Sequence, residues 1–199
     1  MLPFNQNLQG ERFFCRYERE TQVAMPGYYS VKLADMNIDV ELTVTERTAM
    51  HKYTFNQPGE ANLLLDLQNG LVFNSKNIRY RVLEGEVEML DNKTIAGYNR
   101  VRGWVARYFY YMIVFDRPYT VKKELPQEEG EKAKRFILEF DLKEGESVQV
   151  KVALSTVGIE GAKMALDKEN PGWNFESIKA ETNGKWNDML SLAEVELSL

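Results

Sequence analysis

The sequence contains one cysteine, Cys15, and one histidine, His51. A single cysteine excludes a disulfide within the chain and leaves the redox compartment undetermined. With so few histidines and cysteines, a zinc site would need carboxylates for its remaining ligands, which is uncommon. Calcium needs only oxygen ligands, but the loop pattern D-x-[DN]-x-[DN]-G does not occur. We therefore expect this chain to bind no metal and no other cofactor of its own.

The sequence also lacks clusters of basic residues and long apolar runs. It has 25 Lys and Arg residues against 30 Asp and Glu residues, which gives a formal net charge of −5. Nucleic acid binding requires clustered Lys and Arg, so this balance argues against it. No stretch approaches the roughly 20 apolar residues of a membrane span. The start, MLPFNQNLQG, lacks the pattern of a signal peptide. We expect a soluble chain with no membrane span, whose localisation its own residues leave unknown.

The composition is that of a globular protein with a full core. Hydrophobic residues make up 44% of the 199 residues and charged residues 28%, whereas a disordered chain has far fewer apolar residues. A chain of this length commonly forms one domain. We predict one structural domain, with a β-sandwich over residues 1–157 and a helical linker segment over residues 158–199 that packs on the sandwich.

Residues 26–55 predict three adjacent strands. Pro26-Gly27 is a turn pair, because proline fixes φ at the first corner and glycine accepts a positive φ at the next. Apolar and polar residues then alternate over residues 29–34 and 38–45, and a third run spans residues 50–55. The connections are too short for a crossover helix, so these strands should form an antiparallel meander.

Further strands are expected along the chain. Short apolar runs between turn residues predict them at residues 12–17, 61–67, 78–83, 86–90, 103–115, 136–142 and 147–154. Glu84-Gly85 and Lys143-Glu144-Gly145 are interpreted as hairpin turns. Residues 103–115 are apolar or aromatic at nearly every position and should form a central strand that buries Trp104, and residues 116–135 are the longest expected loop. About ten short strands without alternating helices predict an all-β fold, an antiparallel β-sandwich.

After Gly158 the pattern becomes helical. Apolar residues at helical spacing predict a helix over residues 159–169, which Asn170-Pro171-Gly172 ends. Asn174 is a candidate N-cap for a second helix that extends to Leu192. The sandwich should therefore carry two C-terminal helices.

The segments PGYYSVKL (residues 26–33) and ELTVTERTAMHKYTF (residues 41–55) resemble the N-terminal domain of glycoside hydrolase family 92, the calcium-dependent exo-acting α-mannosidases. The family pattern reads roughly P-G-Y-Y-x-V-x-L and then E-L-T-x-T-x-R-x-G-x-H-x-Y-x-F. Two positions depart from it. Ala49 stands at the usual glycine, and Arg19 stands where the family has the histidine of an F-S-H-x-x-E segment.

The resemblance implies a partner and an activity beyond this chain. The two C-terminal helices would link to a catalytic helical barrel that the chain lacks. The parent enzyme would remove terminal mannose from glycans with calcium as its cofactor, and its relatives are typically exported, which implies a periplasmic or secreted protein. The catalytic acid and base of the family belong to the barrel. This implies no catalytic residue in the present chain, which alone should be inactive.

The residues themselves give no clear catalytic group. No serine lies in a G-x-S-x-G segment, and spacing cannot select the two carboxyl groups of a glycosidase among 30 Asp and Glu residues. We predict a structural role for the motif of Glu41, Thr43, Arg47 and His51. In this interpretation Arg47 pairs with Glu41, and His51 bonds to a neighbouring strand or to Glu41.

Aromatic side chains are the remaining candidates for contact with a mannose-containing glycan, because the apolar C–H face of a sugar packs on such rings. Tyr28 and Tyr29 lie beside the predicted turn, and Trp173 precedes the second helix. These three residues are the predicted carbohydrate-binding residues.

Our first hypothesis is the non-catalytic N-terminal β-sandwich of an α-mannosidase-like glycoside hydrolase. It would contribute to the active-site cleft and expose an apolar face where the barrel packs. A stand-alone carbohydrate-binding sandwich and a structural interaction domain are the alternatives, because sandwiches host many unrelated functions.

Overall fold

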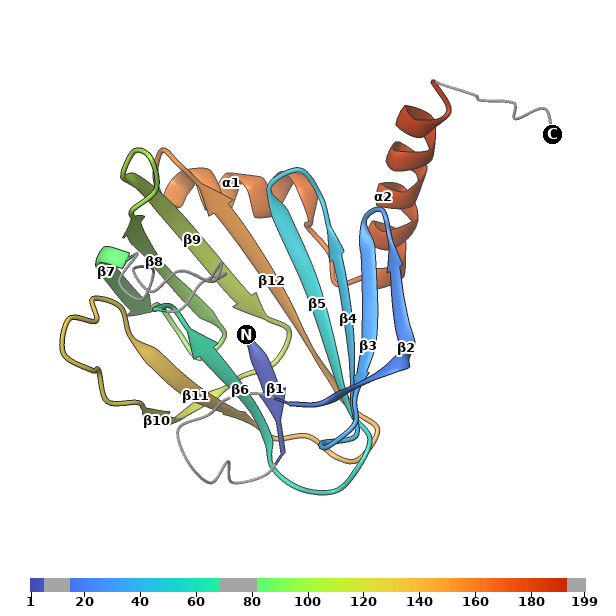
Figure 1. The fold of residues 1–199 in the computed structure, drawn as a ribbon, viewed down its shortest axis with the longest axis horizontal. Coiled ribbons are helices and arrows are strands. Elements are labelled where there is room, and N and C mark those ends of the chain that lie inside the picture. The colour runs from blue at the N-terminus through green and yellow to red at the C-terminus, as the bar shows by residue number, and fades with distance from the viewer. Residues whose placement is uncertain (6–14, 69–81, 193–199) are drawn as a thin grey trace.

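The computed structural model describes residues 1–5, 15–68 and 82–192. Within these residues twelve strands form two antiparallel sheets, and two helices follow the last strand (Figure 1). The predicted all-β sandwich with two C-terminal helices is confirmed.

The larger sheet has eight strands, each antiparallel to its neighbours. In spatial order they are β2 (Tyr17–Met25), β3 (Tyr28–Leu33), β4 (Ile38–Val44), β5 (Thr48–Phe55), β12 (Ser147–Ser155), β9 (Arg107–Phe115), β8 (Thr94–Val101) and β7 (Val82–Met89). The meander predicted over residues 28–55 forms strands β3, β4 and β5. Gly27 takes a φ of 78° in the turn from β2 to β3, as expected for the glycine of the Pro26-Gly27 pair.

The smaller sheet has four strands. In spatial order they are β1 (Leu2–Phe4), β6 (Ala61–Asp66), β11 (Arg135–Phe140) and β10 (Thr120–Glu124). Strand β6 confirms the strand predicted at residues 61–67 from the turn residues on either side. Strand β10 lies within the predicted loop of residues 116–135, which is therefore shorter than expected.

The core lies between the two sheets. Ile38, Tyr53 and Phe115 from the larger sheet pack in one cluster with Leu63 and Leu138 from the smaller sheet, and each of these side chains is at most 2% exposed. Because side chains alternate across a strand, the neighbours of Ile38, Tyr53 and Phe115 along their strands point to the outer face of the larger sheet.

The helices cover part of that outer face. Helix α1 (Ile159–Glu169) buries Ala162, Ala165 and Leu166 in a cluster with residues of β8, β9 and β12. Helix α2 (Phe175–Leu190) buries Phe175 and Ile178 against Met50 of β5. Both helices match their predicted ranges closely.

The hairpin predicted at Glu84-Gly85 is wrong. Gly85 lies inside β7 and pairs with Asn99 of β8, while residues 78–81 lie outside the described part of the chain. A Cβ atom at Gly85 would stand 2.6 Å from Asn99 Oδ1 and 3.1 Å from Ala133 Cβ. The glycine here permits close packing rather than a turn. Strand β8, its true partner, was not predicted.

The hairpin predicted around Lys143-Glu144-Gly145 is also wrong. The turn itself exists, since Gly145 has a φ of 79° and Glu146 N donates to Lys143 O at 3.0 Å. The flanking strands β11 and β12 lie in different sheets, however, so the turn carries the chain across the sandwich. A turn signal does not tell whether the strands beside it pair.

The prediction that Trp104 is buried in a central strand is wrong. Strand β9 begins only at Arg107, and Trp104 is fully exposed in the bend before it. The second half of β9 is buried as expected, with Tyr111, Ile113 and Phe115 in the main core. Of the strand predicted at residues 12–17, residues 12–14 lie outside the described part, and β2 begins at Tyr17.

Candidate functional site

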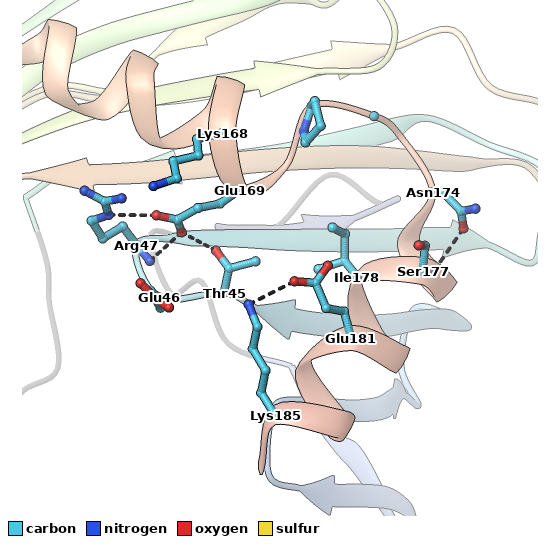
Figure 2. Close-up of a pocket in the computed structure, with 12 residues that line it drawn as sticks. Thr45, Glu46, Arg47, Lys168, Glu169, Asn174, Ser177, Ile178, Glu181 and Lys185 are labelled. Atoms are coloured by element: carbon cyan, nitrogen blue, oxygen red, sulfur yellow. Dashed lines mark hydrogen bonds and ion pairs between the residues drawn. The ribbon is translucent and has the colours of Figure 1, made fainter. Parts of the chain in front are cut away.

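The β4–β5 turn, the end of α1 and the start of α2 surround a cavity of about 510 Å³ (Figure 2). These segments are distant in sequence and meet because both helices pack on the outer face of the larger sheet. The polar residues that line the cavity include Thr45, Glu46, Arg47, Lys168, Glu169, Asn174, Ser177, Glu181 and Lys185.

Glu169 is the centre of the hydrogen bonds in this cavity. Its Oε2 accepts from the Thr45 hydroxyl at 2.7 Å and from the Arg47 backbone N–H at 2.9 Å, and its Oε1 accepts from Arg47 Nε at 2.7 Å. Burial by itself raises the pKa of Glu169, but the hydrogen bonds from Thr45 and Arg47 outweigh it and the pKa lies below its usual value. The carboxylate ties the last turn of α1 to the β4–β5 turn (Figure 2).

The hydrogen bonds of Glu169 suit a structural link between α1 and the β4–β5 turn better than proton transfer to a substrate. An ionised carboxylate with both oxygens engaged cannot donate a proton at neutral pH. The other charged side chains of the cavity balance one another, since Glu46 and Glu181 stand against Lys168 and Lys185. What the site can do chemically is hold two helices and a turn in fixed positions and offer polar groups at its rim.

Local capping positions helix α2 beside this cavity. The Asn174 side chain accepts from Ser177 N at 3.1 Å, which confirms the predicted N-cap. Further along the helix, the Thr182 hydroxyl donates to Val44 O at 2.6 Å. A Cβ atom at Gly27 would overlap Thr182 Cγ2. Glycine at this position therefore permits both the positive φ of the turn and the close packing of α2 on the turn.

Replacing Glu169 with glutamine should loosen this attachment. The variant Glu169→Gln keeps the shape of the side chain and loses the charge that Arg47 and Thr45 bind, at a position where the side chain is only 11% exposed. We expect the free energy of unfolding, measured by urea denaturation, to fall by about 1 to 2 kcal/mol. The matched control is Glu181→Gln, which breaks an ion pair with Lys185 whose side chains are both 58% exposed, and which should cost less than about 0.5 kcal/mol. Equal losses in the two variants would contradict this role of Glu169.

The predicted pairing of Arg47 with Glu41 is wrong. Glu41 instead accepts from the Tyr28 hydroxyl at 2.9 Å and pairs with Lys52 at 3.0 Å. Burial raises the pKa of Glu41, but these two partners outweigh it and the pKa is lowered. Thr43 is buried and donates from its hydroxyl to Gly27 O at 2.8 Å. Cross-strand neighbours thus satisfy Glu41, while the turn directs Arg47 toward α1.

His51 lies on the core face of β5 rather than toward Glu41. Its Nδ1 is 2.8 Å from the hydroxyl oxygen of Tyr53, two residues along the same strand, and the two rings meet edge to face. Burial lowers the pKa of His51 to about 4, with a smaller contribution from the charged amino terminus. The partner is therefore on the same strand, which corrects the predicted bond to a neighbouring strand or to Glu41.

The three predicted carbohydrate-binding residues are not all brought together. Tyr28 and Trp173 pack in the same cluster under α2, with Lys179 Nζ 3.7 Å from the Tyr28 ring centroid and Lys151 Nζ 4.3 Å from that of Trp173. Tyr29 points to the opposite face of the sheet, packs on the main core and accepts from Gln22 Nε2 at 3.2 Å. The period of two along a strand already required this separation.

A tyrosine cluster on the outer face of β8 and β9 was not predicted. The ring centroids of Tyr98, Tyr108 and Tyr110 lie within 6.1 Å of one another, and the hydroxyls of Tyr98 and Tyr108 donate to Glu84. The hydrogen bond to Glu84 raises the pKa of Tyr98 to about 12. The alternation within the aromatic run of residues 108–111 could have predicted this cluster.

The role of Glu169 was also not predicted. The available sequence signal was a negative charge in the last turn of a helix, where the helix dipole disfavours it unless a partner is present.

Helix α2 exposes an apolar face beyond the cavity. Trp186, Met189 and Leu190 are 46%, 66% and 57% exposed. A second hollow of about 620 Å³ lies between this face and the end of β4, and Val44 and Thr182 also line it. We call Val44, Trp186, Met189 and Leu190 the α2 face.

The described residues, 1–5, 15–68 and 82–192, hold no group of metal ligands. No three His, Cys, Asp or Glu side chains among them come together as a metal site. Neither α1 nor α2 is long and apolar enough to cross a membrane.

Comparison with known proteins gives one family and several structures. The model of the glycosyl hydrolase family 92 N-terminal domain matches residues 2–155. The fold is similar to that of a family GH92 alpha-mannosidase from Bacteroides thetaiotaomicron, with a TM-score of 0.81 and 24% identity, over 99% of this chain and 29% of that chain. A family GH92 inverting mannosidase from Bacteroides thetaiotaomicron VPI-5482 matches with a TM-score of 0.79 and 18% identity, over 100% of this chain and 27% of that chain.

These two structures establish a shared fold, and the present chain spans less than a third of either one. The comparison with curated proteins gives no match.

Proposed function

Because the chain belongs to the N-terminal domains of glycosyl hydrolase family 92, we propose that it is the non-catalytic β-sandwich of an α-mannosidase-like glycoside hydrolase. In this proposal it forms one wall of the active-site cleft and packs on a catalytic helical barrel. The parent enzyme removes terminal mannose from glycans outside the cytoplasm, in the periplasm or after secretion. The similarity to two mannosidase structures supports this, since most of the length of each lies beyond the part that this chain matches.

The α2 face is the observation that carries the proposal. An aromatic and two long apolar side chains are each about half or more exposed on the helix that follows the sandwich. Contiguous exposed apolar surface commonly marks an interaction site. The hollow beside Trp186 adds a recess into which a side chain of the barrel would insert.

Calcium belongs to the parent enzyme in this proposal. The described residues offer no cluster of three or more acidic, histidine or cysteine ligands, so the ligands would come from the barrel. In this proposal no step of the reaction is assigned to residues of this chain; Glu169, the carboxylate at the centre of the cavity, is held in an ion pair with Arg47.

The proposal predicts that the chain alone is inactive and binds its barrel through the α2 face. With p-nitrophenyl α-mannoside and calcium, the isolated chain should release no mannose. The barrel encoded by the same gene, produced separately, should bind the chain in a calorimetric titration, and Trp186→Ser should weaken that binding by about thirtyfold or more, because buried tryptophans dominate interface energies.

Val157→Ser is the matched control, since Val157 is an apolar residue that is 86% exposed away from α2, and its substitution should leave barrel binding unchanged. Mannose release by the chain alone would contradict the non-catalytic assignment. Equal binding by the Trp186 and Val157 variants would contradict the assignment of the α2 face to the barrel.

A further inference from the structure

The bend between β8 and β9 presents an exposed tryptophan. Trp104 is fully exposed and its neighbour Val105 is 65% exposed. Within the part of the chain that the structure describes, the Trp104 side chain forms no hydrogen bond and no ring contact. Helix α2 packs beside β4, and strands β5 and β12 lie between β4 and the strands that the bend joins (Figure 1). The bend is therefore a surface feature separate from the α2 face.

The segment around this bend carries positive charge alone. Residues 92–115 include Lys93, Arg100, Arg102 and Arg107 and contain no Asp or Glu, although the formal net charge of the chain is −5. Arg100 lies 4.0 Å from Glu84 of β7 in an ion pair. Arg102 and Arg107 are exposed and form no ion pair with another described residue. Their two guanidinium groups are available to an anionic partner.

The order of the residues in the bend matches the chemistry of a phospholipid surface. Arg102 and Arg107 flank Trp104 and Val105 in the sequence. Tryptophan is enriched at membrane–water interfaces, because its ring is largely apolar and its N–H can bond to polar headgroups. Arginine binds phosphate oxygens through two parallel hydrogen bonds. Apolar side chains beside basic ones are typical of segments that lie on anionic bilayers without crossing them.

The small size of the tip favours a lipid surface over a second protein. One aromatic side chain buries about 150 to 250 Å², whereas a stable protein interface buries about 800 Å² on each partner. Insertion into a fluid headgroup layer does not require so large a complementary surface. We propose that the β8–β9 bend binds bilayers that contain anionic phospholipids. Trp104 and Val105 enter the headgroup layer, and Arg102 and Arg107 contact lipid phosphates.

Cosedimentation of the chain with lipid vesicles tests the proposal. With vesicles of equal parts phosphatidylcholine and phosphatidylglycerol, we expect half-saturation below about 1 mM lipid. Binding should weaken in about 0.5 M salt, because the added ions screen the charges. Trp104→Ser should weaken it by about tenfold or more, and Arg102→Gln by about fivefold, since each basic residue near the surface adds to the attraction.

Tyr17→Ser is the matched control. Tyr17 is an aromatic residue that is 54% exposed on the edge strand β2. The strand register places it at the opposite end of the larger sheet from the bend, so its substitution should leave vesicle binding unchanged. A thermal melt of each variant shows whether it folds, and Arg102→Gln remains as a test if Trp104→Ser does not.

Weaker binding in Trp104→Ser and Arg102→Gln, with normal binding in Tyr17→Ser, would support the proposal. No cosedimentation at about 1 mM lipid would overturn it, as would equal binding to vesicles of phosphatidylcholine alone. A Trp104→Ser variant that loses affinity for the barrel, in a chain that does not bind vesicles, would assign the bend to the barrel instead. The vesicle experiment needs no barrel, so this proposal and the proposed function fail separately.

Discussion

Gly97→Ala is expected to destabilise the fold by about 3 kcal/mol or more. Gly97 lies inside β8, where a Cβ atom would overlap the backbone oxygen of Glu86 and stand 2.5 Å from the Tyr111 hydroxyl. That hydroxyl donates to Glu86 O at 2.9 Å, and Tyr111 is 5% exposed in the core. The added methyl group therefore separates β7 from β8 or expels the tyrosine, and either change breaks a buried hydrogen bond.

Urea denaturation of the wild type and of Gly97→Ala measures this loss of stability directly. Gly184→Ala is the matched control, because Gly184 lies in α2 and a Cβ atom added there would meet no atom within 4 Å outside its own helix backbone. In that helix the same substitution should raise the free energy of unfolding by about 0.5 to 1 kcal/mol. A Gly97→Ala protein as stable as the wild type would show that β7 and Tyr111 are not packed as described.

Acidification from about pH 7 to about pH 4.5 is expected to lower the free energy of unfolding by about 2 kcal/mol through His51 alone. Burial lowers the pKa of His51 in the folded chain to about 4, from 6.5 when unfolded. Between these values the unfolded chain binds a proton that the folded chain does not, so stability is present above pH 6.5 and is lost as the pH falls toward 4. Glu41 and Glu169, whose pKa values are lowered from 4.5, lose their contribution to stability only as the pH falls through and below 4.5, at the acid end of this window.

The variant His51→Asn separates this effect from general acid denaturation. Asparagine keeps a polar group near the Tyr53 hydroxyl, which lies 2.8 Å from Nδ1 of the histidine, and it does not titrate. The free energy of unfolding of this variant should change little between about pH 7 and about pH 4.5. An unchanged pH dependence in the variant would show that another group is responsible.

The sequence by itself determined the elements whose signals are local. Alternation over residues 28–55 predicted β3, β4 and β5, the Pro26-Gly27 pair predicted their leading turn, and Asn174 predicted the start of α2. The same residues carried the family resemblance, which the match over residues 2–155 confirms. These signals succeed because period, caps and turn chemistry act over a few neighbouring residues. The alternation of side chains along a strand also predicts that Tyr28 and Tyr29 point to opposite faces of the sheet.

Only the tertiary structure decided which distant segments meet. Glycine at position 85 signals a turn and a close strand contact equally well, and only the neighbouring Ala133 and Asn99 show that it serves the contact. Arg47 is bound by Glu169, 122 residues away, because α1 folds back over the sheet. The ammonium of Lys151 stands over the Trp173 ring for the same reason. Local patterns fix backbone conformation, whereas partners, burial and cavities follow from packing between segments that the sequence order does not bring together.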